Sequence, residues 1–435
     1  MRIRTQSWDG GDADRFAVSL RAAAPRPAGI AAAVATTIER VRSGGDAALR
    51  ELSEEFDGIA AEPFEIAPER VATAPAEIAA GLRNAIEEEA ANVRAVAAAQ
   101  VEAQAEPRPL TLDAGQRIEL GEVPVGSAGI YVPGGRAPYP SSLVMGVVPA
   151  RMAGVERVVV ASPPEPGTGE PAPAVLAAAA IVGADAFYAV GGAQAIAAFA
   201  YGTESIPAVD VIAGPGSPWV QEAKLQCSRQ VGIDGYAGPS ELVVIALEDA
   251  PSEWIALDLC AQAEHGDDGL LVAISADAAW LERLAEAIEA VQARREDPGN
   301  ATFDLVLVDG ADAAVALTQA LAPEHTEVIA PGGAELARRL TTTGCVFVGA
   351  DSATAFGDYA VGSNHVLPTG GAGRFTGPLG PGTFRRRTCR VEIGEGTAKA
   401  LAGTVDEIAR AEGLPIHGES ATVRAYGRNA PGEAE

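Results

Sequence analysis

The four histidines of the chain are the side chains best suited to chemistry. His265, His325, His365 and His417 lie near glycine, proline or carboxylate residues, and none lies within an apolar run. A histidine used only for core packing would not show that bias. Near neutral pH an imidazole can act as a general base or as a metal ligand. The pattern therefore predicts that all four belong to functional sites.

His265 follows Gln262 by three residues in Ala261-Gln-Ala-Glu-His-Gly266. We expect a helix over Leu257 to Glu264, which would place both side chains on one face near its C-terminal end. A histidine with a second donor at this spacing is a usual half-site for a metal. A histidine at a helix end can also cap carbonyl groups or pack, so this segment alone leaves both interpretations open.

Glu324 and His325 are adjacent where a predicted helix ends and a strand, Thr326 to Ala330, is expected to begin. Two titratable groups at a strand entrance can share one cleft and serve as general acid and base. A capping pair is the alternative interpretation. The other two histidines lie in a glycine-rich loop that contains Asp358 and in a segment that begins at Glu412.

Three glycine turns could contact a nucleotide. Gly214-Pro-Gly-Ser217 follows a predicted strand and opens a helix, so its backbone N–H groups could approach a phosphate. The third glycine of a GxGxxG fingerprint is missing, and no acidic residue stands out about twenty positions on. Tyr131-Val-Pro-Gly-Gly135 and Gly191-Gly-Ala-Gln194 are similar turns. A phosphate or ribose site spread over these loops and ordinary tight turns are equally consistent with the sequence.

These side chains must be positioned by a larger α/β framework. Apolar residues at helical spacing predict helices between about 29 and 104, and a further helix is expected from Thr397 to Ala411. From about Val123, short β-branched runs alternate with helical segments, which is typical of parallel strands joined by crossover helices. The runs suffice for two sheets, with Ala237 to Ser240 as their expected joint. The predicted strands are Val158–Ala161, Ala186–Val190, Val209–Ala213, Leu242–Ala246, Leu270–Ile274, Leu305–Val308, Thr326–Ala330 and Val346–Val348.

Length and charge limit the class of protein. A chain of 435 residues is expected to form two main domains. It carries 59 acidic residues against 32 lysines and arginines, a formal charge of −27, and Lys224 and Lys399 are its only lysines. A dispersed acidic surface poor in lysine is expected of a protein kept soluble in a salty cytoplasm. The same charge argues against nucleic-acid binding.

The cysteines and the N-terminus indicate a cytosolic protein. The sequence has no CxxC spacing, no apolar signal-peptide core and no uninterrupted apolar run long enough to span a membrane. Cys260 lies two residues from Gln262 and would point away from the same helix face. Nothing near the other cysteines indicates an activated thiolate, so a thiol mechanism is not expected. The four cysteines are Cys227, Cys260, Cys345 and Cys389.

Taken in order, these segments resemble the histidinol dehydrogenases, and the resemblance covers nearly the whole chain. Its motifs are Tyr131-Val-Pro-Gly-Gly135, Tyr139-Pro-Ser-Ser142, Gly214-Pro-Gly216, Ala237-Gly-Pro-Ser-Glu241, Gln262-Ala-Glu-His-Gly266, Pro323-Glu-His325, Gly357-Asp-Tyr359, Asn364-His-Val-Leu-Pro-Thr369 and Glu412-Gly-Leu with His417.

The resemblance implies two incomplete Rossmann-like α/β domains with mainly parallel sheets, a helical N-terminal region and a small helical C-terminal extension. The expected boundaries are 1–27 for an N-terminal extension and 28–127 plus 241–375 for a first domain, which carries most metal and catalytic residues. Residues 128–240 would form a second, NAD-binding domain. Residues 376–435 would form an extension that reaches a partner subunit.

The resemblance also implies an activity, the zinc-dependent four-electron oxidation of L-histidinol to L-histidine through L-histidinaldehyde with two NAD. These are the last steps of histidine biosynthesis. His325 would be the general base and Glu324 would activate water.

Because the tail comes from the neighbouring subunit in this family, a homodimer with shared active sites is implied. One zinc per subunit would be held by Gln262, His265, Asp358 and His417, the substrate by these four with Ser240, His325, His365 and Glu412, and NAD by Tyr131, Gln194 and Ser217.

The chain departs from the family at Ser217 and Trp219, where the family usually has Asn and Tyr, and a shorter hydroxyl would weaken a ribose contact. Gly377 to Gly382 also replaces a more usual Ser-Gly-Leu-Ser run. Two other functions are consistent with the sequence: a paralogous zinc and NAD dehydrogenase of another small diol or amino alcohol, and a non-enzymatic nucleotide-binding module. The intact set of acid, base and ligand residues favours histidinol oxidation over both.

Overall fold

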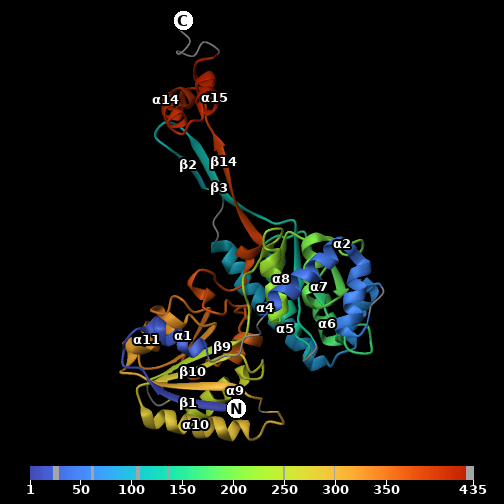
Figure 1. Cartoon of the computed structure of the whole chain (residues 1–435), viewed down its shortest axis with the longest axis vertical. Coiled ribbons are helices and arrows are strands. Elements are labelled where there is room, and N and C mark those ends of the chain that lie inside the picture. Colours follow the sequence, from blue (N-terminus) through green and yellow to red (C-terminus); the bar gives the residue numbers. More distant parts are fainter. Residues whose placement is uncertain are drawn as a thin grey trace. The chain divides into compact units, whose positions relative to one another are not determined.

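The computed structural model describes residues 1–22, 29–59, 63–103, 108–134, 137–247, 250–297 and 299–427. It divides into two compact units (Figure 1). The larger unit comprises Met1–Gln100 and Val125–Phe384, and the smaller comprises Val101–Pro124 and Arg385–Glu435. The larger unit contains two parallel sheets, each covered by helices on both faces.

The first sheet has six parallel strands in the order β1-β11-β10-β9-β12-β13. Every residue of β9 and β10 is buried, as expected of central strands in a parallel sheet. Alternate residues of these strands pack against α9 and α10 on one face and against α1 and α11 on the other. The elements are β1 (Arg2–Ser7), α1 (Ala13–Arg21), β9 (Glu241–Ala246), α9 (Ser252–Gln262), β10 (Leu270–Ser275), α10 (Ala278–Gln292), β11 (Thr302–Leu307), α11 (Ala311–Leu321), β12 (His325–Ile329), α12 (Gly333–Arg338), β13 (Cys345–Val348) and α13 (Thr354–Tyr359).

The second sheet has five parallel strands in the order β6-β5-β4-β7-β8. One face packs against α4, α5 and α6, and the other against α2, α7 and α8. The elements are α2 (Ile30–Asp57), α3 (Pro68–Thr73), α4 (Ala80–Ala103), β4 (Ser127–Tyr131), α5 (Pro140–Met152), β5 (Arg157–Ser162), α6 (Pro173–Val182), β6 (Ala186–Ala189), α7 (Gly192–Tyr201), β7 (Val211–Ala213), α8 (Pro218–Cys227) and β8 (Gly232–Ile233).

The smaller unit is a three-stranded antiparallel sheet with a helical hairpin. Its strands lie in the order β14-β3-β2, and α14 packs against α15. Short 3-10 turns, Ala372–Arg374 and Pro381–Phe384, precede β14 in the larger unit. The elements are β2 (Arg108–Thr111), β3 (Arg117–Pro124), β14 (Arg385–Glu392), α14 (Glu395–Ala411) and α15 (Pro415–Tyr426).

The α/β fold class is confirmed, with mainly parallel sheets and a helical C-terminal extension. Each predicted strand is present, and the loop 237–240 joins the two sheets. The grouping of segments differs from the prediction. Helices α2 and α4, expected to join residues 241–375, cover the five-stranded sheet instead. Helical periodicity identifies an apolar face but not the sheet that this face will cover.

The N-terminal segment expected as an extension supplies a strand and a helix of the six-stranded sheet. Strand β1 pairs with β11, and α1 packs against α11. Among the described residues, no helix is both long enough and apolar enough to cross a membrane.

Candidate active site

A cavity of about 620 Å³ opens in the larger unit, within the size range of small-molecule sites. The five-stranded sheet contributes Tyr131 at the carboxyl end of β4 and Ser217 at the start of α8. The six-stranded sheet contributes Ser240 and Glu324, which immediately precede β9 and β12. The cavity therefore joins the carboxyl edge of one parallel sheet to the amino edge of the other.

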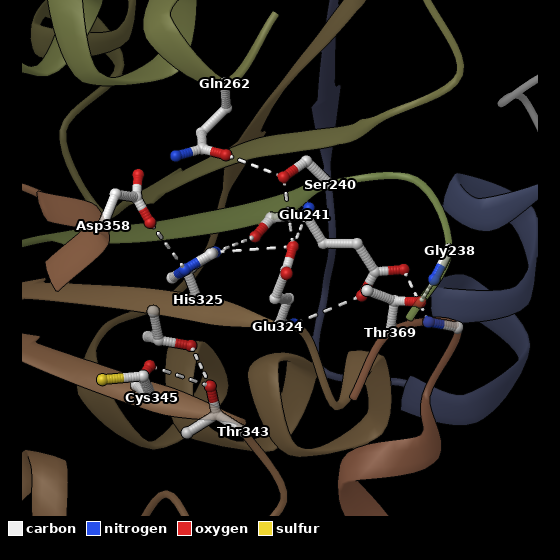
Figure 2. A network of polar contacts seen from close by, with 12 residues as sticks. Gly238, Ser240, Glu241, Gln262, Glu324, His325, Thr343, Cys345, Asp358 and Thr369 are labelled. Carbon is white, nitrogen blue, oxygen red and sulfur yellow. Dashed lines mark hydrogen bonds and ion pairs between the residues drawn. The ribbon is translucent and has the colours of Figure 1, made fainter. Parts of the chain in front are cut away.

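His325, the first residue of β12, is buried beside two carboxylates (Figure 2). Its Nδ1–H donates to the Glu241 carbonyl oxygen at 3.2 Å, and Nδ1 lies 3.5 Å from Glu324 Oε2. Its Nε2 lies 3.8 Å from Asp358 Oδ1. Burial lowers the pKa of His325, but Glu324 and Asp358 outweigh it and raise the pKa to about 9. The backbone contact leaves Nε2 as the nitrogen available for proton transfer.

The Glu324 carboxylate is held from the start of the neighbouring strand. Its Oε2 accepts a hydrogen bond from the Glu241 backbone N–H at 2.9 Å and lies 3.2 Å from Ser240 Oγ. Ser240 Oγ is also 3.0 Å from Gln262 Oε1, so its single proton can be donated to only one of the two acceptors at a time. This network links the predicted acid–base pair to a predicted metal ligand.

Three predicted metal ligands, Gln262, His265 and Asp358, line the cavity together. The prediction that Gln262 and His265 share a helix face is wrong, because α9 ends at Gln262 and His265 lies in the following bend. Gly266, with a φ of +154°, continues the chain away from helical geometry. No group of three His, Cys, Asp or Glu side chains that could hold a metal occurs among the described residues.

The donor chemistry at this place nevertheless fits a metal. One imidazole, one carboxylate and one amide oxygen form a mixed nitrogen and oxygen set of the kind that Zn²⁺ accepts. The fourth predicted ligand, His417, lies in the first turn of α15 in the smaller unit and is exposed. Glu412, also predicted to bind substrate, is exposed at the C-terminal end of α14.

His365 lines the same cavity in a neutral form. Its Nδ1–H donates to the Asp358 carbonyl oxygen at 2.9 Å, and its Nε2 lies 3.2 Å from Ser142 Oγ. Burial lowers the pKa of His365 and outweighs the neighbouring carboxylates. The backbone contact fixes the tautomer, so Nε2 is the acceptor and a polar ligand would compete with Ser142 for it.

The predicted nucleotide contacts are only partly brought together. Tyr131 and Ser217 line the cavity, whereas Gln194 is buried in the first turn of α7 and is not among the lining residues. Tyr131 Oη accepts the Gly192 backbone N–H at 3.1 Å. Burial raises the pKa of Tyr131 to about 12, so its hydroxyl stays protonated and can donate into the cavity.

Two further residues were not found by reading the sequence. Asp57, at the end of α2, lines the cavity, and its Oδ2 is buried without a hydrogen-bond partner among the described residues. Burial raises the pKa of Asp57 to about 6. Glu241 holds both Glu324 and His325. Asp57 lies far from the glycine turns in sequence, and Glu241 looks like an ordinary strand residue, so no local pattern marks either one.

A family model described as histidinol dehydrogenase matches residues 21–425. A histidinol dehydrogenase from Haloarcula marismortui is 42% identical over 394 residues, which cover 89% of this chain and 92% of that protein. One from Aromatoleum aromaticum is 38% identical, covering 92% of each chain. The crystal structure of histidinol dehydrogenase from Elizabethkingia anophelis superposes with a TM-score of 0.88 at 27% identity and covers 98% of both chains.

Proposed function

The chain belongs to the histidinol dehydrogenase family, and from this premise we propose that it oxidises L-histidinol to L-histidine in two NAD-dependent steps through bound L-histidinaldehyde. The observation that supports this most directly is the network of Ser240, Glu324, His325 and Asp358 at one cavity, in which Glu324 and His325 are buried. In this network His325 can accept the proton of the alcohol, and the Glu324 carboxylate can accept a proton from water. NAD, when bound, supplies the hydride acceptor for both oxidations.

In the first oxidation His325 removes the hydroxyl proton of the substrate. The Glu241 carbonyl holds Nδ1–H, so Nε2 takes up that proton as hydride leaves the carbinol carbon. Nε2 lies 3.8 Å from Asp358, a proposed metal ligand, so the base is close to the proposed metal. A cation on Asp358 would offset part of the negative charge that raises the pKa of His325.

In the second step Glu324 removes a proton from the water that adds to the aldehyde carbon. As the water adds, His325 returns to the aldehyde oxygen the proton that it took in the first oxidation, which gives the hydrate and restores the base. His325 then deprotonates a hydroxyl group of the hydrate as the second hydride leaves its carbon, and the carboxylic acid that forms ionises to the carboxylate. Ser240 and the Glu241 N–H fix the Glu324 carboxylate from one side. This leaves its other lone pairs for water.

We propose that one zinc per subunit is held by Gln262, His265 and Asp358 together with His417. When bound, zinc would anchor the imidazole and amine of the substrate and polarise its oxygen. Ser240, His365 and Glu412 would complete the substrate contacts. Since Glu412 and His417 lie in the smaller unit, we propose that they act in the partner's site of a homodimer.

For NAD we propose contacts with Tyr131, Gln194 and Ser217, where loops after parallel strands and helix N-termini commonly receive a dinucleotide. The cavity-facing Asp57 is suited to accept hydrogen bonds from ribose hydroxyls. We further propose that the protein works in the cytoplasm and that its dispersed acid, with a net charge of −27, suits a salty one.

The test is the stoichiometry of NADH formed per L-histidinol consumed, measured with and without a metal chelator. A ratio near two that collapses on chelation and returns with zinc supports the proposal. Turnover of another alcohol but not of histidinol would indicate a paralogous dehydrogenase. Absence of NADH from every alcohol tested would indicate a binding module.

A further inference from the structure

A bidentate ion pair lies directly behind the Glu324–His325 pair. Arg21, the last residue of α1, directs Nη1 to Glu241 Oε1 and Nη2 to Glu241 Oε2, the second contact at 3.0 Å. Arg21 Nη2 also donates to the Leu321 carbonyl oxygen at 2.5 Å. The side chains are 15% and 6% exposed, so the pair is largely removed from water.

Glu241 contacts both proposed catalytic residues. Its backbone N–H binds the Glu324 carboxylate at 2.9 Å, and its carbonyl oxygen accepts the His325 Nδ1–H at 3.2 Å. Its own carboxylate accepts the Glu324 backbone N–H at 3.3 Å and the Gly370 N–H at 2.9 Å. Figure 2 shows the Glu241 backbone beside the Glu324 carboxylate, and the Glu241 side chain reaching back to the Glu324 main chain. Glu324 is therefore held by Glu241 at both its main chain and its carboxylate.

The charge of Arg21 is needed for this arrangement. A buried carboxylate without a cation is costly, and Glu241 lies next to a second buried carboxylate, Glu324. The planar guanidinium can engage both oxygens of Glu241 in one plane, which a lysine cannot. Removing that cation would leave the Glu241 carboxylate buried without an opposite charge and would favour its displacement, so the Glu324 carboxylate would lose its fixed support.

The same sheet contains a comparable ion pair that touches no cavity residue. Arg4 on β1 binds Asp304 on β11, with Nε to Oδ1 at 2.7 Å and Nη2 to Oδ2 at 2.6 Å. Asp304 is as buried as Glu241. This pair provides a control for the effect on stability alone.

We propose that Arg21 and Glu241 are positioning residues that hold the Glu324 carboxylate for water activation in the aldehyde-oxidising step. This inference rests on the proposed function and extends it to a helix near the N-terminus. The ion pair should therefore influence the second oxidation more than the first, because Glu324 has its chemical role in the second.

The test compares two rates on the same zinc-loaded, full-length preparations. One is hydride transfer from L-histidinol in a single turnover, and the other is kcat for added L-histidinaldehyde, both at saturating NAD. The amplitude of the single-turnover phase gives the concentration of active sites, and kcat is calculated from that concentration, so unfolded protein does not change the ratio. The variants are Glu241→Gln, Arg21→Met, Arg21→Lys and the control Asp304→Asn.

For Glu241→Gln and Arg21→Met we expect kcat with the aldehyde to fall about tenfold at an almost unchanged KM, while the first hydride transfer falls less than about threefold. In Arg21→Lys the ratio should lie between the values of Arg21→Met and the parent, because lysine keeps the positive charge but cannot contact both carboxylate oxygens of Glu241 in one plane. Asp304→Asn should lower the thermal midpoint and leave the ratio unchanged.

An unchanged ratio in Glu241→Gln and Arg21→Met would overturn the positioning role and leave the pair a structural one. An equal change in Asp304→Asn would overturn it too. If the unmodified chain oxidises neither substrate, the proposed function itself fails. If the unmodified chain is active and the variants keep its ratio of rates, only the positioning role fails.

Discussion

The imidazole of His325 is the most direct test of the proposed chemistry, because its two nitrogens face Glu241 and Asp358. Asparagine at this position can still form a hydrogen bond but cannot accept a proton. We expect His325→Asn to lower kcat by about 10²- to 10⁴-fold. Zinc content and L-histidinol affinity, measured by elemental analysis and calorimetry, should stay within about twofold. Loss of bound zinc would show that His325 is a ligand rather than the base.

Glu89 on α4 provides a prediction about pH. It is 5% exposed, and its Oε1 has no hydrogen-bond partner among the described residues. Burial raises its pKa from 4.5 to about 8. The folded protein therefore holds this proton between those pH values while the unfolded chain has released it, so the contribution of Glu89 to the free energy of unfolding falls as pH rises through that window.

In Glu89→Gln that contribution disappears. The variant should gain free energy of unfolding relative to the parent as pH rises from about 5 to about 8, by up to about 3 kcal/mol after allowing for partial solvent screening. Urea unfolding at several pH values measures the difference. The exposed Glu88→Gln on the same helix is the control. A difference that does not vary with pH would contradict burial as the cause.

At the residue scale, the sequence predicted those functional side chains whose neighbours in the sequence are themselves suited to chemistry. Glu324 and His325 were identifiable because two titratable groups adjoin where a strand is expected to begin, and the structure places both at the cavity. Glu241 could not be identified in this way. Its role depends on contacts with α1 and with the start of β12, and these contacts leave no local pattern in the sequence. The ligand assignments at Gln262, His265 and Asp358 came from the family resemblance and stay predictions.

At the scale of elements, the turn 214–217 depends on a buried ion pair. Lys224 Nζ donates to the Gly214 carbonyl oxygen at 2.9 Å and pairs with Asp234, whose Oδ2 accepts the Gly214 N–H at 2.8 Å. Gly214 has a φ of +125°, and a Cβ there would lie 2.1 Å from the Tyr131 carbonyl oxygen. Both polar groups of this glycine are thus clamped where the turn meets β4.

We expect Lys224→Met to cost about 3–5 kcal/mol of the free energy of unfolding, because Asp234 would stay buried without its cation. NAD affinity, measured by fluorescence titration, should fall as well, since the turn lines the cavity. Adding Asp234→Asn should recover part of both losses. Lys399→Met, at the only other lysine, should change neither, because Lys399 and its partner Glu395 are both exposed to solvent. Equal effects at the two lysines would contradict the clamp.

The elements themselves were predictable where one physical signal dominates. Apolar β-branched runs such as β9 and β10 indicate buried parallel strands whatever surrounds them. Strand β1, with the sequence RIRTQS, alternates with charged residues and lies at a sheet edge, so its pattern gave no such signal. The assignment of α2 and α4 failed for a different reason, because an apolar helix face does not specify its partner.

At the scale of the whole molecule, the charge of −27 sets the response to salt. Dispersed like charges repel one another most strongly in the compact state, and salt screens them over about 10 Å at 0.1 M. We expect the thermal midpoint to rise with KCl from about 0.1 M to about 2 M. Sucrose at matched osmolality controls for solvent exclusion. A midpoint independent of KCl would contradict adaptation to a salty cytoplasm.

The smaller unit raises the question of which subunit uses its side chains. His417 and Glu412 are exposed there, whereas His325 lies at the cavity of the larger unit. If active sites are shared between subunits, a site needs His325 from one chain and His417 from the other. His325→Asn and His417→Ala homodimers should then each be almost inactive.

Unfolding and refolding the two variants together at equal amounts should give half heterodimers, each with one intact site and one doubly altered site. Activity should therefore recover to about one quarter of the parent. The same mixture without refolding is the control and should stay inactive if subunits do not exchange. If each site is built from a single chain, every site in the heterodimer keeps one lesion and no activity returns. Recovery in the refolded mixture alone would therefore assign His417 to the partner's site, which the inactivity of either homodimer cannot do.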